Sequence, residues 1–454
     1  MRPAWPSGRP TLLSSPPALD LGRLSRRQEL ATAAAAAAVT AAAAAVPAAL
    51  SINGSDRQKQ LVLCTSTTAL LRFVIILLAL RHVRRVWRQG STLVAETRAA
   101  VEGSLFTEVA PGVSLHHLIT VLPPAASGEA TVALPPLLLH LNHGFGASAL
   151  TFDKFWASLN FSTSRPVCLS SHDRTGFGLS SRPADPEAYT DDQGAAHANA
   201  LLDLLPGAET LLGGHSIGAG LAARMASAPG AAAAEGGRVQ ALVLIAPALL
   251  PPRTRPSAAA PTPPPGASAR RDAAASLGRT LRATLAKPTG WLVLAAVRLA
   301  VRCVIFSRRF WNIALHIAYA KPANPEPEMM VRYRWPAQVH GADRGVACVA
   351  LAMMWRSKDE LMQRLTGRTS RSGVGRQQTD AEVCERLAAL GLPILILHGT
   401  ADRIVPISNS RALARKLPAA RLVEIQGCGH VPHEEAPAEA AEALQKFARE
   451  CGLL

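Results

Sequence analysis

The chain has 454 residues, of which 48% are hydrophobic and 18% are charged. This length is sufficient for roughly two to four domains, and the apolar fraction excludes a fully disordered protein. The apolar runs are too few and too short for a membrane protein with several spans. The seven cysteines are an odd number without a C-x-x-C pair, which excludes a disulfide framework and a cysteine-based zinc ribbon and predicts a reducing compartment.

The net charge of +16 is spread unevenly along the sequence. Basic residues exceed acidic ones by 9 over residues 1–90 and by 14 over 251–380, whereas acidic residues exceed basic ones by 6 over 91–250 and by 1 over 381–454. The basic blocks contain no helix-turn-helix, zinc-finger or RNA-recognition pattern and few aromatic residues, so we expect no nucleic-acid partner. An anionic membrane surface is the better expected partner.

Residues 1–60 have the composition of a disordered segment without a packed core. Arg and Ser recur through residues 1–27, acidic residues are few, and two poly-alanine runs follow at 33–38 and 41–45. This pattern is typical of an organellar transit peptide. The alternative is an alanine-biased tail without a targeting role.

Residues 61–100 predict a membrane-anchor region. Leu61–Leu80 is long enough to span a bilayer, but Arg72 and the polar run Thr65–Thr68 weaken a spanning interpretation. A single-pass span would place the rest of the chain on the cytoplasm-like side; an interfacial amphipathic helix and a helix packed on the globular part are the alternatives. The arginines that follow share one helical face: Arg81, Arg84, Arg85 and Arg88.

From residue 105 onward, short β-rich runs alternate with helical stretches. Short strands buried on both faces and separated by helices indicate an α/β fold, with a mostly parallel sheet covered by helices on both sides. We assign 105–250 and 386–454 to two parts of one core. The predicted strands are Val113–Val121, Leu137–Leu141, Val167–Ser170, Thr210–Leu212, Leu242–Ile245, Ile394–Leu397 and Leu422–Ile425.

Residues 251–385 interrupt this alternation and predict a helical cap insertion. The segment begins with a Pro/Ala-rich run and ends with a Gly/Ser/Arg-rich stretch, and both compositions are typical of flexible connections. Trp291–Ala320 is apolar and strongly helical in pattern, with Arg298 and Arg302 one turn apart. Ordinary packing on the core and an Arg-edged surface that admits an acyl chain from a membrane are both consistent with this helix.

The segment Leu211–Gly220 reads LLGGHSIGAG and contains the pattern G-x-S-x-G, from Gly214 to Gly218. A short apolar strand leads into the motif and a helix of small residues follows, which is the setting that the motif requires. Glycines allow a strained turn and a close chain passage, so the hydroxyl of Ser216 would be exposed at a helix N-terminus, where negative charge is favoured. We therefore predict that Ser216 is a nucleophile.

Asn142–Ser148 reads NHGFGAS and directly follows the predicted strand LLLHL. A glycine-flanked turn at this place can offer the free N–H of Phe145, which would form an oxyanion hole together with the N–H of Ile217. Gly144–Ala149 also matches the dinucleotide pattern G-x-G-x-x-G/A, but no acidic residue closes the following strand about 20 residues later. We therefore disfavour a nucleotide cofactor.

Two further loops that follow strands carry an acid and a histidine. Asp402 lies in PILILHGTADRIVP, and His430 lies in QGCGHVPHEEAP, just before a predicted helix. Serine, acid and histidine in this order, each after a strand, match the triad order of α/β-hydrolases. Asp173 precedes the serine, so we interpret it, paired with Arg174, as a brace for the loops around the site.

Two other histidines lie beside these motifs. His433 follows His430 by about one helical turn, and we interpret it as a brace for the loop. His215 precedes the serine, and we expect it to pack or to line the pocket rather than to transfer a proton. We expect no metal and no organic cofactor.

These motifs make the chain resemble the α/β-hydrolase superfamily, in the branch with an HGFGAS-type oxyanion loop and a DRxGFGLSSRP segment. Plant and algal plastid hydrolases with a helical lid are similar to it, which implies the chloroplast or another organelle as the location. The resemblance covers about 137–250 and 390–437. The roles that it implies are nucleophile for Ser216, base for His430, orienting acid for Asp402, and backbone oxyanion donors for Phe145 and Ile217.

The predicted function is hydrolysis of a carboxylic ester, with a lipid ester among the candidates, through an acyl-enzyme. The elbow lacks the carboxylate that epoxide hydrolases and haloalkane dehalogenases need. One alternative is an acyltransferase, although the H-x-x-x-x-D motif is missing because His197 and Asp203 are one residue too far apart; the other is a non-catalytic ligand-binding protein of the same fold. The expected partners are a small-molecule or lipid ester and a membrane surface, and the sequence leaves the oligomeric state open.

Overall fold

The computed structural model describes residues 95, 99–122, 135–161, 163, 165–204, 209–249, 294–320, 327–354 and 378–454, all of which fall in one compact unit. The predicted transit peptide and the predicted membrane-anchor helix at 61–80 lie outside these residues. Within the described ranges, no helix is both long enough and apolar enough to cross a bilayer.

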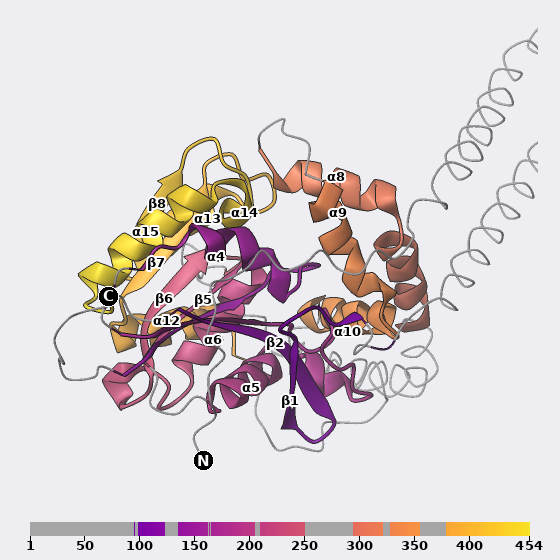
Figure 1. Ribbon diagram of the computed structural model, residues 1–454, viewed down its shortest axis with the longest axis horizontal. Coiled ribbons are helices and arrows are strands. Elements are labelled where there is room, and N and C mark those ends of the chain that lie inside the picture. Colours follow the sequence, from indigo (N-terminus) through magenta and orange to yellow (C-terminus); the bar gives the residue numbers. More distant parts are fainter. Residues whose placement is uncertain are drawn as a thin grey trace, which may run out of the picture. The chain divides into compact units, whose positions relative to one another are not determined.

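An eight-stranded sheet forms the centre of this unit (Figure 1). Its strands are β1 (Leu105–Ala110), β2 (Val113–Leu122), β3 (Leu137–Asn142), β4 (Val167–His172), β5 (Glu209–His215), β6 (Val239–Ile245), β7 (Ile394–Gly399) and β8 (Ala420–Ile425). They lie in the order β1-β2-β4-β3-β5-β6-β7-β8. β2 pairs antiparallel with β1 and β4, and every other pair is parallel. The predicted α/β fold with a mostly parallel sheet is confirmed.

The central strands form because their residues are apolar toward both sides of the sheet. All six residues of β3 (LLLHLN) and of β7 (ILILHG) are buried, as expected for parallel strands covered by helices on both faces. β1 was not predicted: its residues are exposed or half-buried at the sheet edge, so they form no buried apolar run. Parallel pairing sets Asn142 of β3 opposite Gly214 of β5, and the turns that follow these two strands therefore meet at one edge.

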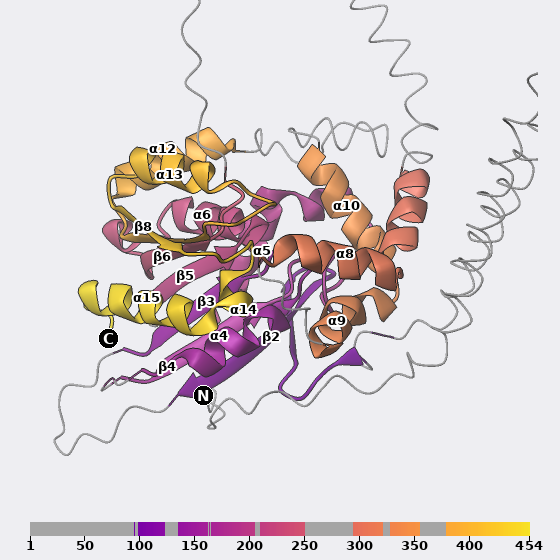
Figure 2. The same cartoon turned by 90° about the horizontal axis from the view of Figure 1, so that it is seen from above.

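Helices cover both faces of the sheet, as Figure 2 shows from above. The helices of the core are η4 (Ala149–Phe152), α4 (Asp153–Ser158), η5 (Pro186–Tyr189), α5 (Asp191–Leu202), α6 (Ile217–Ser227), η6 (Ala233–Glu235), α12 (Asp380–Leu390), α13 (Ile407–Lys416), α14 (Pro432–Glu435) and α15 (Pro437–Glu450). α5, α6, α12 and α13 bury their apolar sides against one face, and α4 and α15 bury theirs against the other.

Further helices lie between β6 and β7 in the sequence and gather at one end of the sheet (Figures 1 and 2). We call α8 (Arg308–Ala318), α9 (Pro327–Arg334), η7 (Trp335–Gln338) and α10 (Ala342–Met354) the inserted helices.

The predicted helical run Trp291–Ala320 is divided in two. Residues 294–305 are helical, and α8 begins anew after Ser307, whose hydroxyl accepts the N–H of Phe310 at 3.1 Å. Apolar periodicity continues through this point, so the capping serine was the sole local signal of the break.

The predicted boundary at 385/386 falls inside α12. Val383, Cys384 and Leu387 of this helix are buried in the same core cluster as α6. The helix therefore packs with the core, although the division of the whole chain into domains stays a prediction.

Candidate active site

Ser216 occupies a strained turn between β5 and α6. Its backbone has φ 54° and ψ −119°, a conformation that side-chain-bearing residues rarely adopt. The Ser216 N–H donates to the Ile245 carbonyl at 2.9 Å, and the Ala248 N–H donates to the Ser216 carbonyl at 3.1 Å. Backbone hydrogen bonds from the neighbouring strand β6 and the residues after it thus hold the turn, and the Ser216 residue is 8% exposed.

The two glycines of G-x-S-x-G are required by close backbone contacts. A Cβ at position 214 would lie 2.3 Å from the Gly218 carbonyl oxygen, and a Cβ at position 218 would lie 2.2 Å from the Asn142 carbonyl oxygen. Both distances are far shorter than any real Cβ contact. The glycines therefore let the start of α6 pass directly beside the end of β3.

The turn after β3 lies against the serine. A Cβ built at Gly144 would lie 3.3 Å from Ser216 Cβ, so the two turns are in contact. Among the described residues, the turn closes through an Ala147 N–H to Gly144 carbonyl bond of 3.3 Å, and the Phe145 N–H has no backbone acceptor. Ile217 is the first residue of α6, so its N–H also lacks an intrahelical partner. The two predicted oxyanion donors therefore belong to adjacent turns.

Asp402 and His430 are in direct contact. Oδ2 of Asp402 lies 2.7 Å from Nδ1 of His430, and both side chains are almost completely buried. Oδ1 of Asp402 accepts the N–H groups of Ile404 and Val405 at 2.7 and 2.9 Å. Burial alone would raise the pKa of Asp402, but hydrogen bonds from His398, His430 and the Val405 N–H hold this pKa well below its usual range.

The backbone of His430 is held from two sides. Its carbonyl oxygen accepts Nε2–H of His215 at 2.8 Å, and its N–H donates to the carbonyl of Ala318 at 2.7 Å. His215 directly precedes the serine, and Ala318 is the last residue of α8. The loop that carries His430 is therefore fixed both to the serine turn and to an inserted helix.

Among the predicted site residues, the structure joins Asp402 to His430 and sets Phe145 and Ile217 in turns that adjoin Ser216. The ring of His430 lies 4.8 Å, centroid to centroid, from that of His215, the residue before the serine. Within the described part of the chain, no hydrogen bond connects the Ser216 hydroxyl to His430. In enzymes without bound substrate this contact is often long.

The other two histidines of the site are buried and neutral. Burial, together with the nearby His433 and His430, places the pKa of His215 well below its usual value. Burial lowers the pKa of His433 to about 4, and its Nε2 lies 3.3 Å from the Thr151 hydroxyl. These contacts are consistent with packing for His215 and a bracing role for His433, and the carbonyl bond of His215 was not foreseen.

Asp173 ties together three segments next to the turn that follows β3. Its carboxylate accepts from the His116 ring and from the N–H groups of Ala149 and Leu179, each at 2.7 Å. Arg174 does not pair with it, because its guanidinium donates to Asp191 at 2.7 Å. The predicted bracing thus takes place through two separate sets of contacts rather than through an Asp–Arg pair.

Two buried groups near His430 were missed in the sequence. Nε2 of His398 lies 3.0 Å from the same Asp402 oxygen that His430 contacts, and its Nδ1 lies 2.6 Å from the Ser410 hydroxyl. The carboxylate of Glu434 accepts the hydroxyl of Tyr319 at 2.6 Å and that of Tyr333 at 3.0 Å. The available signal for His398 was the pattern H-G-x-x-D at the end of a strand, which runs from His398 to Asp402. No local pattern links Glu434 to the distant Tyr319 and Tyr333.

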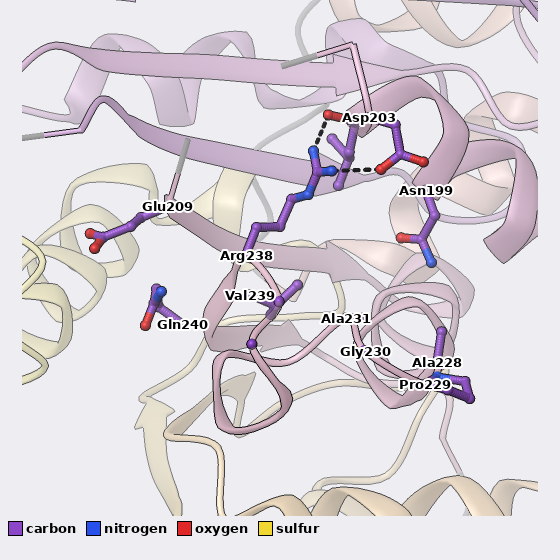
Figure 3. A pocket seen from close by; sticks show the side chains of 13 residues that line it. Asn199, Asp203, Glu209, Ala228, Pro229, Gly230, Ala231, Arg238, Val239 and Gln240 are labelled. Atoms are coloured by element: carbon purple, nitrogen blue, oxygen red, sulfur yellow. Dashed lines mark hydrogen bonds and ion pairs between the residues drawn. The ribbon is translucent and has the colours of Figure 1, made fainter. Parts of the chain in front are cut away.

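A cavity of about 670 Å³ lies beside the first residues of β5 and β6 (Figure 3). Glu209 and Val239, the first residues of β5 and β6, line it, whereas Ser216 follows the last residue of β5. Figure 3 shows the guanidinium of Arg238 directed to Asp203, its ion-pair partner at 2.5 Å. This cavity is separate from the site. In the part of the chain that the structure describes, no three His, Cys, Asp or Glu side chains are grouped to hold a metal ion.

Comparisons of the sequence with known proteins agree with the fold described above. Residues 137–443 match the model of the alpha/beta hydrolase family, which is more than half of the chain, so the chain belongs to that family. A 57-residue stretch is 33% identical to the pimeloyl-[acyl-carrier protein] methyl ester esterase of Aromatoleum aromaticum, but this match spans only 13% of the chain and 23% of the relative.

Solved structures show the same fold. The esterase from Exiguobacterium antarcticum is 16% identical, with a TM-score of 0.50 over 76% of this chain and 98% of the esterase. The bromoperoxidase from Bacillus anthracis is 17% identical, with a TM-score of 0.49 over 76% of this chain and 99% of that protein. At this identity the likeness to the esterase shows the fold alone.

Proposed function

We propose that the protein hydrolyses a carboxylic ester through an acyl-enzyme formed on Ser216. The observation that carries this proposal is the 2.7 Å contact between Asp402 and His430, at the sheet edge where the strained serine turn lies. A carboxylate only accepts hydrogen bonds, so the His430 proton is on Nδ1 and the lone pair is on Nε2. His430 is therefore in the tautomer that a general base requires.

The proposed reaction proceeds in two halves. Ser216 Oγ attacks the ester carbonyl while Nε2 of His430 takes the hydroxyl proton, and the N–H groups of Phe145 and Ile217 stabilise the oxyanion. When the tetrahedral intermediate collapses, the ester C–O bond breaks and His430 returns the proton to the leaving alcohol. Water then repeats the sequence on the acyl-enzyme and releases the acid and free Ser216. Asp402 stays ionised and stabilises the imidazolium in both halves.

The nature of the ester and the place of action are finer parts of the same proposal. The partial match to an esterase that, by its name, acts on a methyl ester of an acyl group supports an ester substrate. We propose a lipid-like ester, a membrane surface as partner, and a chloroplast or other organelle as location; the targeting and anchoring parts rest on the composition of residues 1–100.

A fluorophosphonate probe and short p-nitrophenyl esters test the proposal on the full chain. Ser216→Ala should abolish labelling and reduce turnover by at least about 10³-fold, because the nucleophile is lost. Ser158→Ala is the matched control, since this α4 hydroxyl donates only to the Lys154 carbonyl at 2.9 Å and should leave both readouts unchanged. Labelling or turnover that survives in Ser216→Ala would reject the serine as nucleophile. An unlabelled wild-type chain would favour the non-catalytic alternative.

A further inference from the structure

α8 carries apolar side chains both on its buried side and on part of its exposed side. Trp311 and Leu315 face inward and are 8% and 3% exposed, whereas Phe310, Ile313 and Ile317 are 39%, 53% and 44% exposed. The exposed three follow helical spacing (i, i+3, i+7), so they form one continuous stripe, which runs beside an exposed polar row of Arg309, Asn312 and His316. A helix that only covers a protein core carries polar residues on its outer side. The outer stripe of α8 therefore fits an apolar environment outside the protein.

The inner side of the same helix contacts both loops of the candidate active site. The indole of Trp311 lies 3.2 Å from where a Cβ at Gly146 would be, in the turn that carries Phe145. At the other end of the helix, the Ala318 carbonyl accepts the His430 N–H at 2.7 Å. α8 thus lies directly over the site, with its exposed stripe turned outward.

Charge indicates what kind of surface the stripe meets. Residues 294–320 contain four arginines and no Asp or Glu. Arg298 and Arg302 lie within 3.1 and 3.7 Å of Asp343, but exposed Arg308 and Arg309 have no ion-pair partner among the described residues.

These two arginines stand in the first turn of α8 without an acidic residue. The helix dipole disfavours cations at this end, so they do not stabilise the helix itself. An outside anion would compensate for both charges.

We propose that the exposed side of α8 docks on an anionic phospholipid surface, through the apolar stripe of Phe310, Ile313 and Ile317 and the exposed Arg308 and Arg309 of its first turn. The guanidinium groups contact lipid phosphates, and the apolar stripe enters the boundary of the acyl chains. This proposal rests on the proposed function for its consequence, which is that a lipid-borne ester reaches Ser216 from the membrane side. The docking itself does not depend on catalysis and is measured separately.

Hydrogen exchange of the full chain with vesicles tests the docking. Vesicles containing phosphatidylglycerol should slow amide exchange in α8, high salt should reverse this protection, and pure phosphatidylcholine should give little. Because exchange is read segment by segment, membrane binding by another part of the chain does not imitate the result. Ile313→Asp combined with Ile317→Asp should abolish the α8 protection, and Arg308→Gln combined with Arg309→Gln should remove its dependence on the anionic lipid.

A matched double variant controls for surface charge. Leu105→Asp with Leu204→Asp changes residues that are 45% and 53% exposed on other elements. It should keep the α8 protection, and it should hydrolyse vesicle-borne and soluble esters like the wild type. The Ile313/Ile317 variant should lose about tenfold or more of its rate on a vesicle-borne ester and keep its rate on a soluble ester.

Several outcomes would overturn the proposal. Unchanged exchange in α8 with anionic vesicles would do so, as would equal rates of the Ile313/Ile317 variant and the wild type on a vesicle-borne ester. Strong α8 protection before vesicles are added would also overturn it, because another segment or a protein partner then covers the stripe. Failure of the proposed function is distinct: it would appear as no turnover of soluble ester by the wild type, whatever the exchange data show.

Discussion

At the scale of single residues, Asp402 accepts more hydrogen bonds than its proposed role in a triad requires. One carboxylate oxygen accepts two backbone N–H groups, and the other contacts the imidazoles of both His430 and His398. Nε2–H of His398 is shared with the Val405 carbonyl at 3.0 Å, so its Nδ1 accepts the Ser410 hydroxyl. We therefore expect His398 to position His430 through Asp402.

Replacing His398 should change the pH dependence of the reaction. The His398 bond helps to hold the pKa of Asp402 down, so His398→Phe should raise this pKa, and the acid limb of kcat/KM on a soluble ester should move to higher pH. We expect a loss of at least about tenfold at neutral pH from misplacement of the imidazole. Ser410→Ala removes only the hydrogen bond to Nδ1 of His398 and should leave the acid limb in place. His398→Gln keeps a hydrogen-bond donor and should recover part of the activity. An unshifted acid limb in His398→Phe would limit His398 to packing.

At the scale of elements, the glycines of α6 have opposite roles within one helix. A Cβ at Gly218 would lie 2.2 Å from the Asn142 carbonyl oxygen, whereas a Cβ at Gly220 would find its nearest neighbour, the flexible end of Arg224, at 3.6 Å. Gly218 therefore lies where α6 packs against the end of β3, whereas Gly220 lies at an ordinary position inside the helix.

Gly218→Ala should destabilise the protein by about 2 kcal/mol or more, because α6 must move away from the end of β3. Gly220→Ala should instead stabilise it by about 0.5–1 kcal/mol through the higher helix propensity of alanine. Urea unfolding of both variants measures this contrast, and fluorophosphonate labelling should decrease in Gly218→Ala alone. Equal stabilities of the two variants would contradict the packing that we describe.

The sequence predicted the strands that are apolar toward both faces, and it predicted that Asp402 and His430 follow strands. Since parallel strands end at a common edge, their contact was foreseeable from chain order. β1 was missed because its residues are partly exposed, and the break at Ser307 was hidden by apolar residues on both sides. The bonds of His398 and Glu434 depend on tertiary packing, for which periodicity carries no information.

At the scale of the whole molecule, buried histidines make stability depend on pH. Burial lowers the pKa of seven buried histidines among the described residues: to about 4 for His117 and His433, to about 3 for His140, well below the usual value for His172 and His215, and below the usual value for His143 and His197. They are neutral when folded and take up protons near their ordinary pKa when unfolded. Their contribution to the free energy of unfolding is therefore complete above about pH 6.5 and is lost as the pH falls.

The free energy of unfolding should decrease between pH 7 and pH 5. Each fully titrating histidine contributes a slope of about 1.4 kcal/mol per pH unit. Asp153, whose pKa burial raises to about 7, acts in the opposite direction, but the seven histidines outnumber it and together should cost several kcal/mol over this range. Urea unfolding at pH 7, 6 and 5 measures the slope. A flat stability across this range would mean that these side chains are hydrated or already protonated in the native protein.

The carboxylate of Glu434 accepts the Thr151 hydroxyl of the core. It also accepts the hydroxyls of Tyr319 and Tyr333, which lie in the inserted segment between β6 and β7. A protein reduced to the sheet and the helices on its two faces would lack Tyr319 and Tyr333, which are two of the hydrogen-bond donors to Glu434. It would also lack the Ala318 carbonyl, which accepts the His430 N–H. The inserted segment is thus part of the structure that holds the loop of His430 in place. Chimeras with relatives should exchange residues 294–354 and 430–435 as a single unit.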